Sequence, residues 1–78
     1  EILHAIAELG KGGIFAEPAG AAAYAGVARA ISNGVVGSED PILVINTGSG
    51  LKDIRAAMSA VNPAPVIEPT LDAVKKLL

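Results

Sequence analysis

The feature that constrains the fold most is a continuous aliphatic run, Ile-Leu-Val-Ile, at residues 42–45. Successive side chains of a strand point to opposite faces, so a strand without polar residues is typical of a parallel sheet covered on both faces. The run predicts a main buried strand at about 42–46, and Val66 and Ile67 predict a second, short strand at about 65–67. Two strands do not make a stable parallel sheet. We therefore expect an α/β fold, with this chain a helix-rich piece of a larger open parallel-sheet domain.

Helices are predicted around this strand. An apolar stripe predicts a helix over 2–9 that ends at a glycine-rich segment, and Glu17-Pro18 predicts the start of a second helix that runs to about Ser32 and ends at Asn33-Gly34. Further helices are predicted over 52–60 and 70–78. The helix that starts at Pro18 is nearly all Gly and Ala, which allows a neighbouring backbone to approach closely.

The small size of the chain limits how far it can bury its own apolar residues. It has 78 residues, of which 51% are hydrophobic, but only Phe15 and Tyr24 are aromatic. A chain of this length buries roughly 60–65% of the surface that its unfolded form exposes. With no cysteine it has neither a disulfide nor a zinc-binding cysteine cluster. We expect 1–78 to be a single segment, not a complete catalytic domain, with exposed apolar surface.

The charge pattern excludes several classes of partner. The net charge is −2, and the six Lys and Arg residues are dispersed, which argues against binding to nucleic acid or to an anionic membrane. The uncharged stretch 18–28 is shorter than the roughly 20 residues that span a bilayer, and no signal peptide is evident. No metal site is predicted. We expect a cytoplasmic protein.

The loop 46–53, Asn-Thr-Gly-Ser-Gly-Leu-Lys-Asp, follows the predicted strand and leads into a helix. Open α/β sheets bind ligands at such turns. The dinucleotide-binding pattern fails because Asp53 stands where its third glycine belongs, and the nucleotide triphosphate pattern is absent. Asp53 at the helix start also disfavours a phosphate. The hydroxyl of Thr47 can donate and accept, so it either meets an uncharged ring nitrogen of a ligand or is satisfied by a nearby carbonyl.

Three blocks of sequence carry a resemblance to a known family. They are Gly-Ile-Phe-Ala-Glu-Pro-Ala-Gly-Ala-Ala at 13–22, the loop 46–53, and Val-Ile-Glu-Pro-Thr-Leu at 66–71. Together they resemble the C-terminal third of threonine synthases, pyridoxal-phosphate enzymes whose fold is similar to that of the tryptophan synthase β chain. The Glu-Pro-Ala block is shared with threonine dehydratases and serine racemases, whereas Thr-Gly-x-Gly-Leu-Lys-Asp is the sharper signal. The resemblance spans nearly the whole chain.

The resemblance implies a function for the parent protein, the conversion of O-phosphohomoserine and water to threonine and phosphate. It implies that Thr47 is the hydroxyl partner of the pyridine nitrogen of pyridoxal 5'-phosphate, and that Glu17, Gly48, Ser49 and Gly50 line the cofactor. The family's Schiff-base lysine and phosphate loop lie upstream of this segment. The resemblance thus implies no catalytic residue here, an inactive chain in isolation, and as partners an amino-acid substrate, the rest of the parent chain and a homo-oligomer.

Alternatives remain at several of these positions. Glu17 is either part of the cofactor site or an ordinary carboxylate at a helix N-terminus, where the helix dipole favours it. His4 is expected to be an ordinary helix position, and Tyr24 a packing residue. The parent protein is alternatively another pyridoxal-phosphate lyase of the same fold, such as threonine dehydratase or cysteate synthase. A non-catalytic interaction module that binds a partner through the Ala-rich helix is the alternative from a different class.

Overall fold

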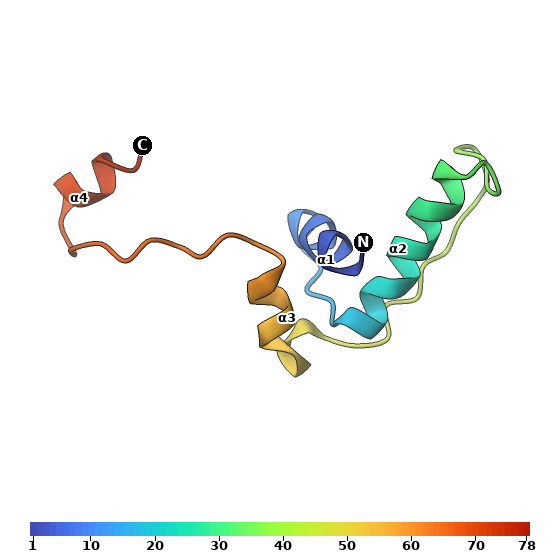
Figure 1. The fold of residues 1–78 in the computed structure, drawn as a ribbon, viewed down its shortest axis with the longest axis horizontal. Helices are drawn as coiled ribbons and strands as arrows, with labels where there is room; N and C mark the ends of the chain where they lie inside the picture. Colours follow the sequence, from blue (N-terminus) through green and yellow to red (C-terminus); the bar gives the residue numbers. More distant parts are fainter.

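The computed structural model describes all of residues 1–78 and is rich in helix (Figure 1). Its elements are α1 (Ile2–Lys11), α2 (Pro18–Ser32), the 3-10 helix η1 (Gly50–Lys52), α3 (Ile54–Ser59) and α4 (Leu71–Lys75). They hold half of the residues. The structure contains no strand, and its one β-bridge pairs Ala16 with Ser49 in the antiparallel sense. The fold of this chain is therefore α-rich.

The two longest helices end in the same way, at a glycine in the left-handed conformation. Gly13 has φ +88° after α1, and Gly34 has φ +72° after α2. In the next residue of each, a backbone N–H donates to a carbonyl of the last helical turn, from Ile14 to Leu9 and from Val35 to Ala30, both at 2.9 Å. This closure satisfies carbonyls that the helix leaves free. The predicted glycine stops are confirmed.

Side-chain caps set the starts of the two short helices. An Asp53 carboxylate oxygen accepts from the Ala56 N–H at 3.1 Å, and the Thr70 hydroxyl accepts from the Ala73 N–H at 3.1 Å. Both contacts satisfy N–H groups that a first turn leaves free. The predicted helix 52–60 is wrong in one respect, because Asp53 has non-helical backbone angles (φ −146°, ψ 75°) and separates η1 from α3. The helix predicted over 70–78 ends at Lys75.

The core is small and lies where α1 packs against α2. Its buried side chains belong to Ala5, Ile6, Ala16 and Ala21. Partly buried residues pack around them: Leu9, Tyr24, Ala25, Ala56 and Ala60. Alanines lie on both sides of this contact, and Tyr24 packs on the core, as predicted.

The strand predicted at 42–46 is not formed, and neither is the one at 65–67. Residues 41–47 take part in no backbone hydrogen bond, and Leu43 and Ile45 are 87% and 67% exposed. Val66 is fully exposed. A strand needs a neighbour for its N–H and C=O groups, and the chain offers none. The predicted α/β class is corrected for this chain to α-rich, while the larger parallel sheet is not part of the structure.

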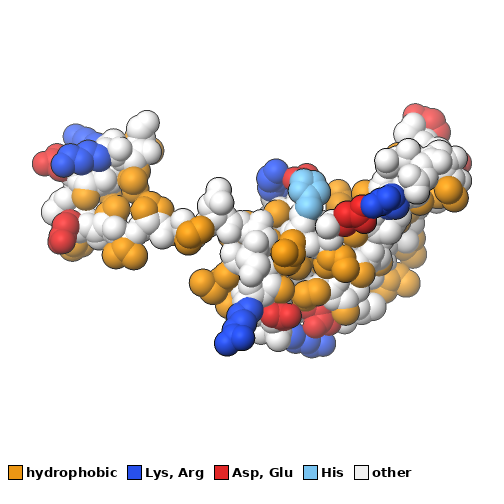
Figure 2. Space-filling view, viewed as in Figure 1, with side chains coloured by type: hydrophobic (Ala, Val, Ile, Leu, Met, Phe, Trp, Pro, Cys, Tyr) orange, Lys and Arg blue, Asp and Glu red, His pale blue; other side chains and the backbone are white.

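The chain is more extended than a compact domain of its size. Its radius of gyration is 16.3 Å, against about 11.5 Å expected for 78 residues. Its accessible surface is 5991 Å², against about 4,400 Å² for a compact protein of this mass. Helix α4 lies apart from the other helices at the end of an extended segment (Figure 1), and hydrophobic side chains are spread over the surface (Figure 2). The prediction of exposed apolar surface is confirmed.

Candidate functional site

The loop 46–50 lies against the segment that leads into α2. The Glu17 N–H donates to the Gly48 carbonyl at 3.1 Å, and the Gly50 N–H donates to the Phe15 carbonyl at 2.9 Å. These bonds flank the antiparallel bridge between Ala16 and Ser49. The loop therefore has a defined position without the strand that was predicted to precede it.

Three glycines allow the close contact between the loop and the start of α2. A Cβ atom on Gly48 would overlap the Glu17 side chain, and one on Gly50 would overlap the Phe15 ring. A Cβ on Gly20 would overlap the side-chain amide of Asn46. Each glycine thus leaves room for a specific neighbour, which a side chain would displace.

Part of this packing could not be read from the sequence. The family resemblance implies that Gly48 and Gly50 line the cofactor, and in the structure they let the loop lie close to Glu17 and Phe15. The contact between Gly20 and Asn46 was missed. Its only signal was the small residue at the first turn of the Ala-rich helix, and that signal does not say which segment approaches.

Glu17 faces the loop rather than the helix that it precedes. It occupies the N-cap position of α2 but makes no side-chain capping hydrogen bond. Its side chain is only 19% exposed, packs on Gly48, and has the Lys52 ammonium 3.7 Å from its Oε1 atom. The Glu17 carboxylate therefore lies between Gly48 and Lys52, which both belong to the loop 46–53.

Thr47 and Ser49 differ in what their hydroxyls do. Ser49 Oγ accepts from the Leu51 N–H at 3.2 Å, so it is engaged in starting η1. Thr47 is exposed and its hydroxyl makes no hydrogen bond within the chain. Of the two roles considered for Thr47, satisfaction by a nearby carbonyl is therefore not what the structure has. Its hydroxyl remains available as donor and acceptor.

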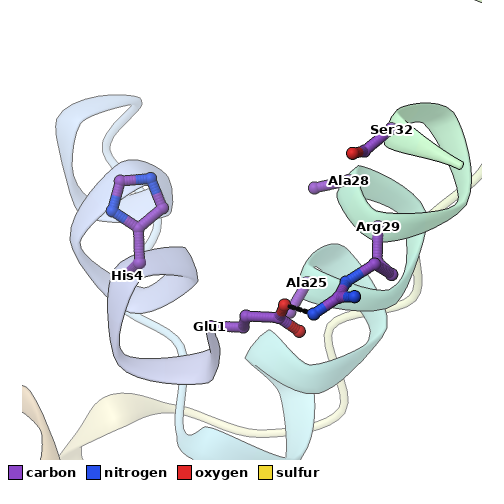
Figure 3. A pocket seen from close by; sticks show the side chains of 6 residues that line it. All are labelled: Glu1, His4, Ala25, Ala28, Arg29 and Ser32. Carbon is purple, nitrogen blue, oxygen red and sulfur yellow. Dashed lines mark hydrogen bonds and ion pairs between the residues drawn. The ribbon is translucent and has the colours of Figure 1, made fainter.

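A separate hollow of about 200 Å³ lies between α1 and α2 (Figure 3). Its lining residues are Glu1, His4, Ala25, Ala28, Arg29 and Ser32. The Glu1 carboxylate and the Arg29 guanidinium form an ion pair at its edge, and His4 is an exposed position on α1 without a hydrogen bond. No residue of the loop 46–53 lines this hollow, which is therefore distinct from the candidate site.

The structure also bears on membranes and metals. None of its helices has the length and apolar character to cross a bilayer. It holds no group of three or more His, Asp or Glu side chains arranged to bind a metal ion. The polar groups of the candidate site are the Thr47 hydroxyl, the backbone of the loop and the Glu17 carboxylate.

Comparison with known proteins gives a consistent set of relatives. The chain is 38% identical over 68 residues to the threonine synthase of Methanocaldococcus jannaschii, covering 87% of this chain and 17% of that protein. It is 40% identical over 59 residues to the threonine synthase of Halalkalibacterium halodurans, covering 76% of this chain and 17% of that protein. The match to the Methanosarcina acetivorans threonine synthase is 33% identical and covers 100% of this chain and 20% of that protein.

Neither a protein-family model nor a solved structure matches the chain. The chain spans about one fifth or less of the length of the relatives named above, at 17–20%. The similarity nevertheless extends over 76–100% of the chain itself. By sequence, the chain belongs to the threonine synthase family, as a segment of such a protein.

Proposed function

We propose that this chain is the C-terminal portion of a threonine synthase that converts O-phosphohomoserine and water to threonine and phosphate. In this proposal it supplies one wall of the pyridoxal 5'-phosphate site. The observation that carries the proposal is the similarity to proteins named threonine synthase over most of the chain. The Thr-Gly-Ser-Gly-Leu-Lys-Asp loop at 47–53 provides the site within that segment.

The loop suits one edge of the cofactor ring. Thr47 offers an exposed hydroxyl without a partner, on a loop that two backbone hydrogen bonds fix to Phe15 and Glu17. A hydroxyl can hydrogen-bond a pyridine nitrogen without placing a full charge beside it. Pyridoxal phosphate, when bound, supplies an electron sink for charge that develops on the substrate. A neutral partner at the ring nitrogen tempers that sink, which restrains side reactions such as transamination.

The other residues of the wall shape the site. Gly48 and Gly50 add no side chains to the loop, while the Ser49 hydroxyl accepts a hydrogen bond from the Leu51 N–H of η1. Glu17 lies beside Gly48 with its carboxylate on the loop side. Lys52 is paired with that carboxylate, so we assign the covalent attachment of the cofactor to another part of the parent protein. The isolated chain is accordingly proposed to be inactive.

The rival functions receive less support. The relatives named above are threonine synthases, which does not favour threonine dehydratase or cysteate synthase. A free-standing interaction module would be expected to cover its apolar residues, whereas only 6 of 78 residues are buried here. The large exposed apolar surface suits a segment that the rest of a larger, homo-oligomeric enzyme covers.

Substitution of Thr47 in the full-length enzyme tests the proposal. Loss of a hydrogen bond between two neutral groups, at about 0.5–1.5 kcal/mol, predicts that Thr47→Ala lowers turnover by about 2- to 10-fold. We expect the absorbance of the bound cofactor to change as well, with a smaller loss of cofactor affinity. Thr47→Ser keeps the hydroxyl and is expected to retain the wild-type spectrum. If Thr47→Ala left both spectrum and turnover unchanged, the assignment would be wrong.

The isolated chain provides a second test. When it is mixed with an equimolar amount of pyridoxal phosphate, we expect the absorbance spectrum of the cofactor to remain that of the free compound. A stoichiometric spectral shift would show that this segment holds the cofactor by itself, contrary to the proposal.

A further inference from the structure

Lys52 has no role in the function proposed so far, although it belongs to the same motif as Thr47. Its ammonium nitrogen lies 3.7 Å from the Glu17 Oε1 atom, across the loop. The two residues come from different elements, η1 and the entry to α2. This ion pair therefore links the two segments that the backbone hydrogen bonds also join.

The environment of Glu17 explains why the pair matters. Its side chain is 19% exposed and accepts no hydrogen bond. The Lys52 ammonium is the one cationic group within 4 Å of it. A largely covered carboxylate without a partner is unfavourable and tends to turn toward water. Without Lys52, Glu17 would be expected to leave its place against Gly48.

A nearby acidic residue does not take the lysine from Glu17. Asp53 follows Lys52 directly, but its carboxylate accepts from the Ala56 N–H at 3.1 Å and caps α3. Asp53 makes no ion pair within 4 Å, whereas Lys52 pairs with Glu17 alone. Asp53 thus contacts the helix that follows it, whereas Lys52 contacts Glu17 beside the loop.

We propose that Lys52 is a positioning residue, which holds the loop 46–50 in place through Glu17 and so fixes the direction of the Thr47 hydroxyl. The effect on the loop stands by itself, and only its consequence for the cofactor rests on the proposed function. Lys52 is 64% exposed, so salt screens the pair in part and its effect is expected to be modest.

Hydrogen–deuterium exchange in the full-length enzyme without cofactor tests the positioning role. The amides to follow are those of Glu17 and Gly50, which donate to Gly48 and Phe15. With the energy of an exposed pair, Lys52→Met is expected to speed their exchange by about 2- to 5-fold. Glu17→Gln is expected to have a similar effect, and the double variant no more than either single one.

Two variants serve as controls. Lys52→Arg keeps the charge and is expected to restore wild-type exchange at both amides. Lys11→Met removes another exposed lysine, paired with Glu8 on α1, and is expected to leave the loop unchanged. Unchanged exchange in Lys52→Met, or equal exchange in Lys52→Arg and Lys52→Met, would overturn the positioning role.

The absorbance of the bound cofactor separates the two proposals. We expect Lys52→Met to change the spectrum in the direction of Thr47→Ala, to a smaller extent, with recovery in Lys52→Arg. If Thr47→Ala changes the spectrum and Lys52→Met does not, the inference about Lys52 is wrong while the proposed function stands. If exchange responds to Lys52→Met but neither variant alters the spectrum, the proposed function fails and the loop contact remains.

Discussion

Two regions of the molecule use apolar residues in opposite ways. In the packed region, which comprises α1, α2, the loop 46–50 and α3, the buried hydrophobic side chains are those of three alanines, among them Ala16 and Ala21, and of Ile6. In the extended segments 41–45 and 61–69 the side chains are large, and Leu43 and Val66 are 87% and 101% exposed. The alanines and Ile6 are packed within the chain, whereas the large aliphatic side chains of the extended segments are mostly exposed. The contrast indicates that residues outside this chain cover the extended segments.

The largest predicted effect compares an aliphatic side chain of each region. Ile6 is 5% exposed in the core, so Ile6→Ala is expected to lower the free energy of unfolding by about 2–4 kcal/mol. Leu43→Ala removes a side chain of similar size that is 87% exposed, and we expect a change within about 0.5 kcal/mol. Urea unfolding followed by circular dichroism measures both. Equal effects would remove the distinction between the regions.

The glycine contacts of the packed region are the next test. Gly50→Ala would push against the Phe15 ring, and overpacking of this kind is expected to cost about 1–3 kcal/mol. Gly26 in α2 is the matched control, because a Cβ there meets nothing within 4 Å. Gly26→Ala should stabilise the helix by about 0.5–1 kcal/mol. If both substitutions stabilised the protein, the close approach at Gly50 would be wrong.

A smaller effect is expected at the junction between the loop and α3. Asp53→Ala removes the cap on the Ala56 N–H and is expected to destabilise by about 1 kcal/mol. Asp53→Asn retains an acceptor and should lose much less. Unfolding measurements on both variants check the prediction, and equal losses would show that the charge rather than the cap is what matters.

The smallest effect concerns an exposed ion pair on α1. The hydrogen bond from Lys11 at 2.8 Å, together with its charge, lowers the pKa of the Glu8 carboxyl below its ordinary value of 4.5. Because the pKa of Glu8 is lower in the folded state, this ion pair contributes to stability above pH 4.5. That contribution is lost as the pH falls through the pKa of the folded state. A carboxyl titration followed by NMR should give a higher Glu8 pKa in Lys11→Met. An unchanged pKa would exclude the pairing.

Local signals predicted the α-helices and the ends of the two long ones, whereas the helices predicted over 52–60 and 70–78 form only over Ile54–Ser59 and Leu71–Lys75. Gly13 and Gly34 closed the two long helices, and Asp53 and Thr70 capped the short ones, because these effects depend on residues a few positions apart. The predicted strands failed for the converse reason. The aliphatic run at 42–45 favours a strand, but strand formation depends on neighbouring strands that this chain does not contain.

The candidate site was predicted in part. The sequence and its family resemblance singled out the loop, Thr47 and Glu17, and the structure brings the loop and Glu17 into contact. The roles of Thr47, Glu17 and the glycines toward a cofactor remain predictions. The packing of Phe15 on Gly50 was not predicted, since it joins positions far apart in the sequence and no local pattern records such a pair.

The most direct test of the contrast between the regions is amide hydrogen exchange at residues 42–47, measured in this chain alone and in the full-length enzyme. In the structure these residues take part in no backbone hydrogen bond. If the segment is completed by the rest of a threonine synthase, its amides should exchange freely in the isolated chain and at least about 100-fold more slowly in the full-length enzyme. Equally fast exchange in both would contradict the account, because the segment would then remain uncovered in the complete protein.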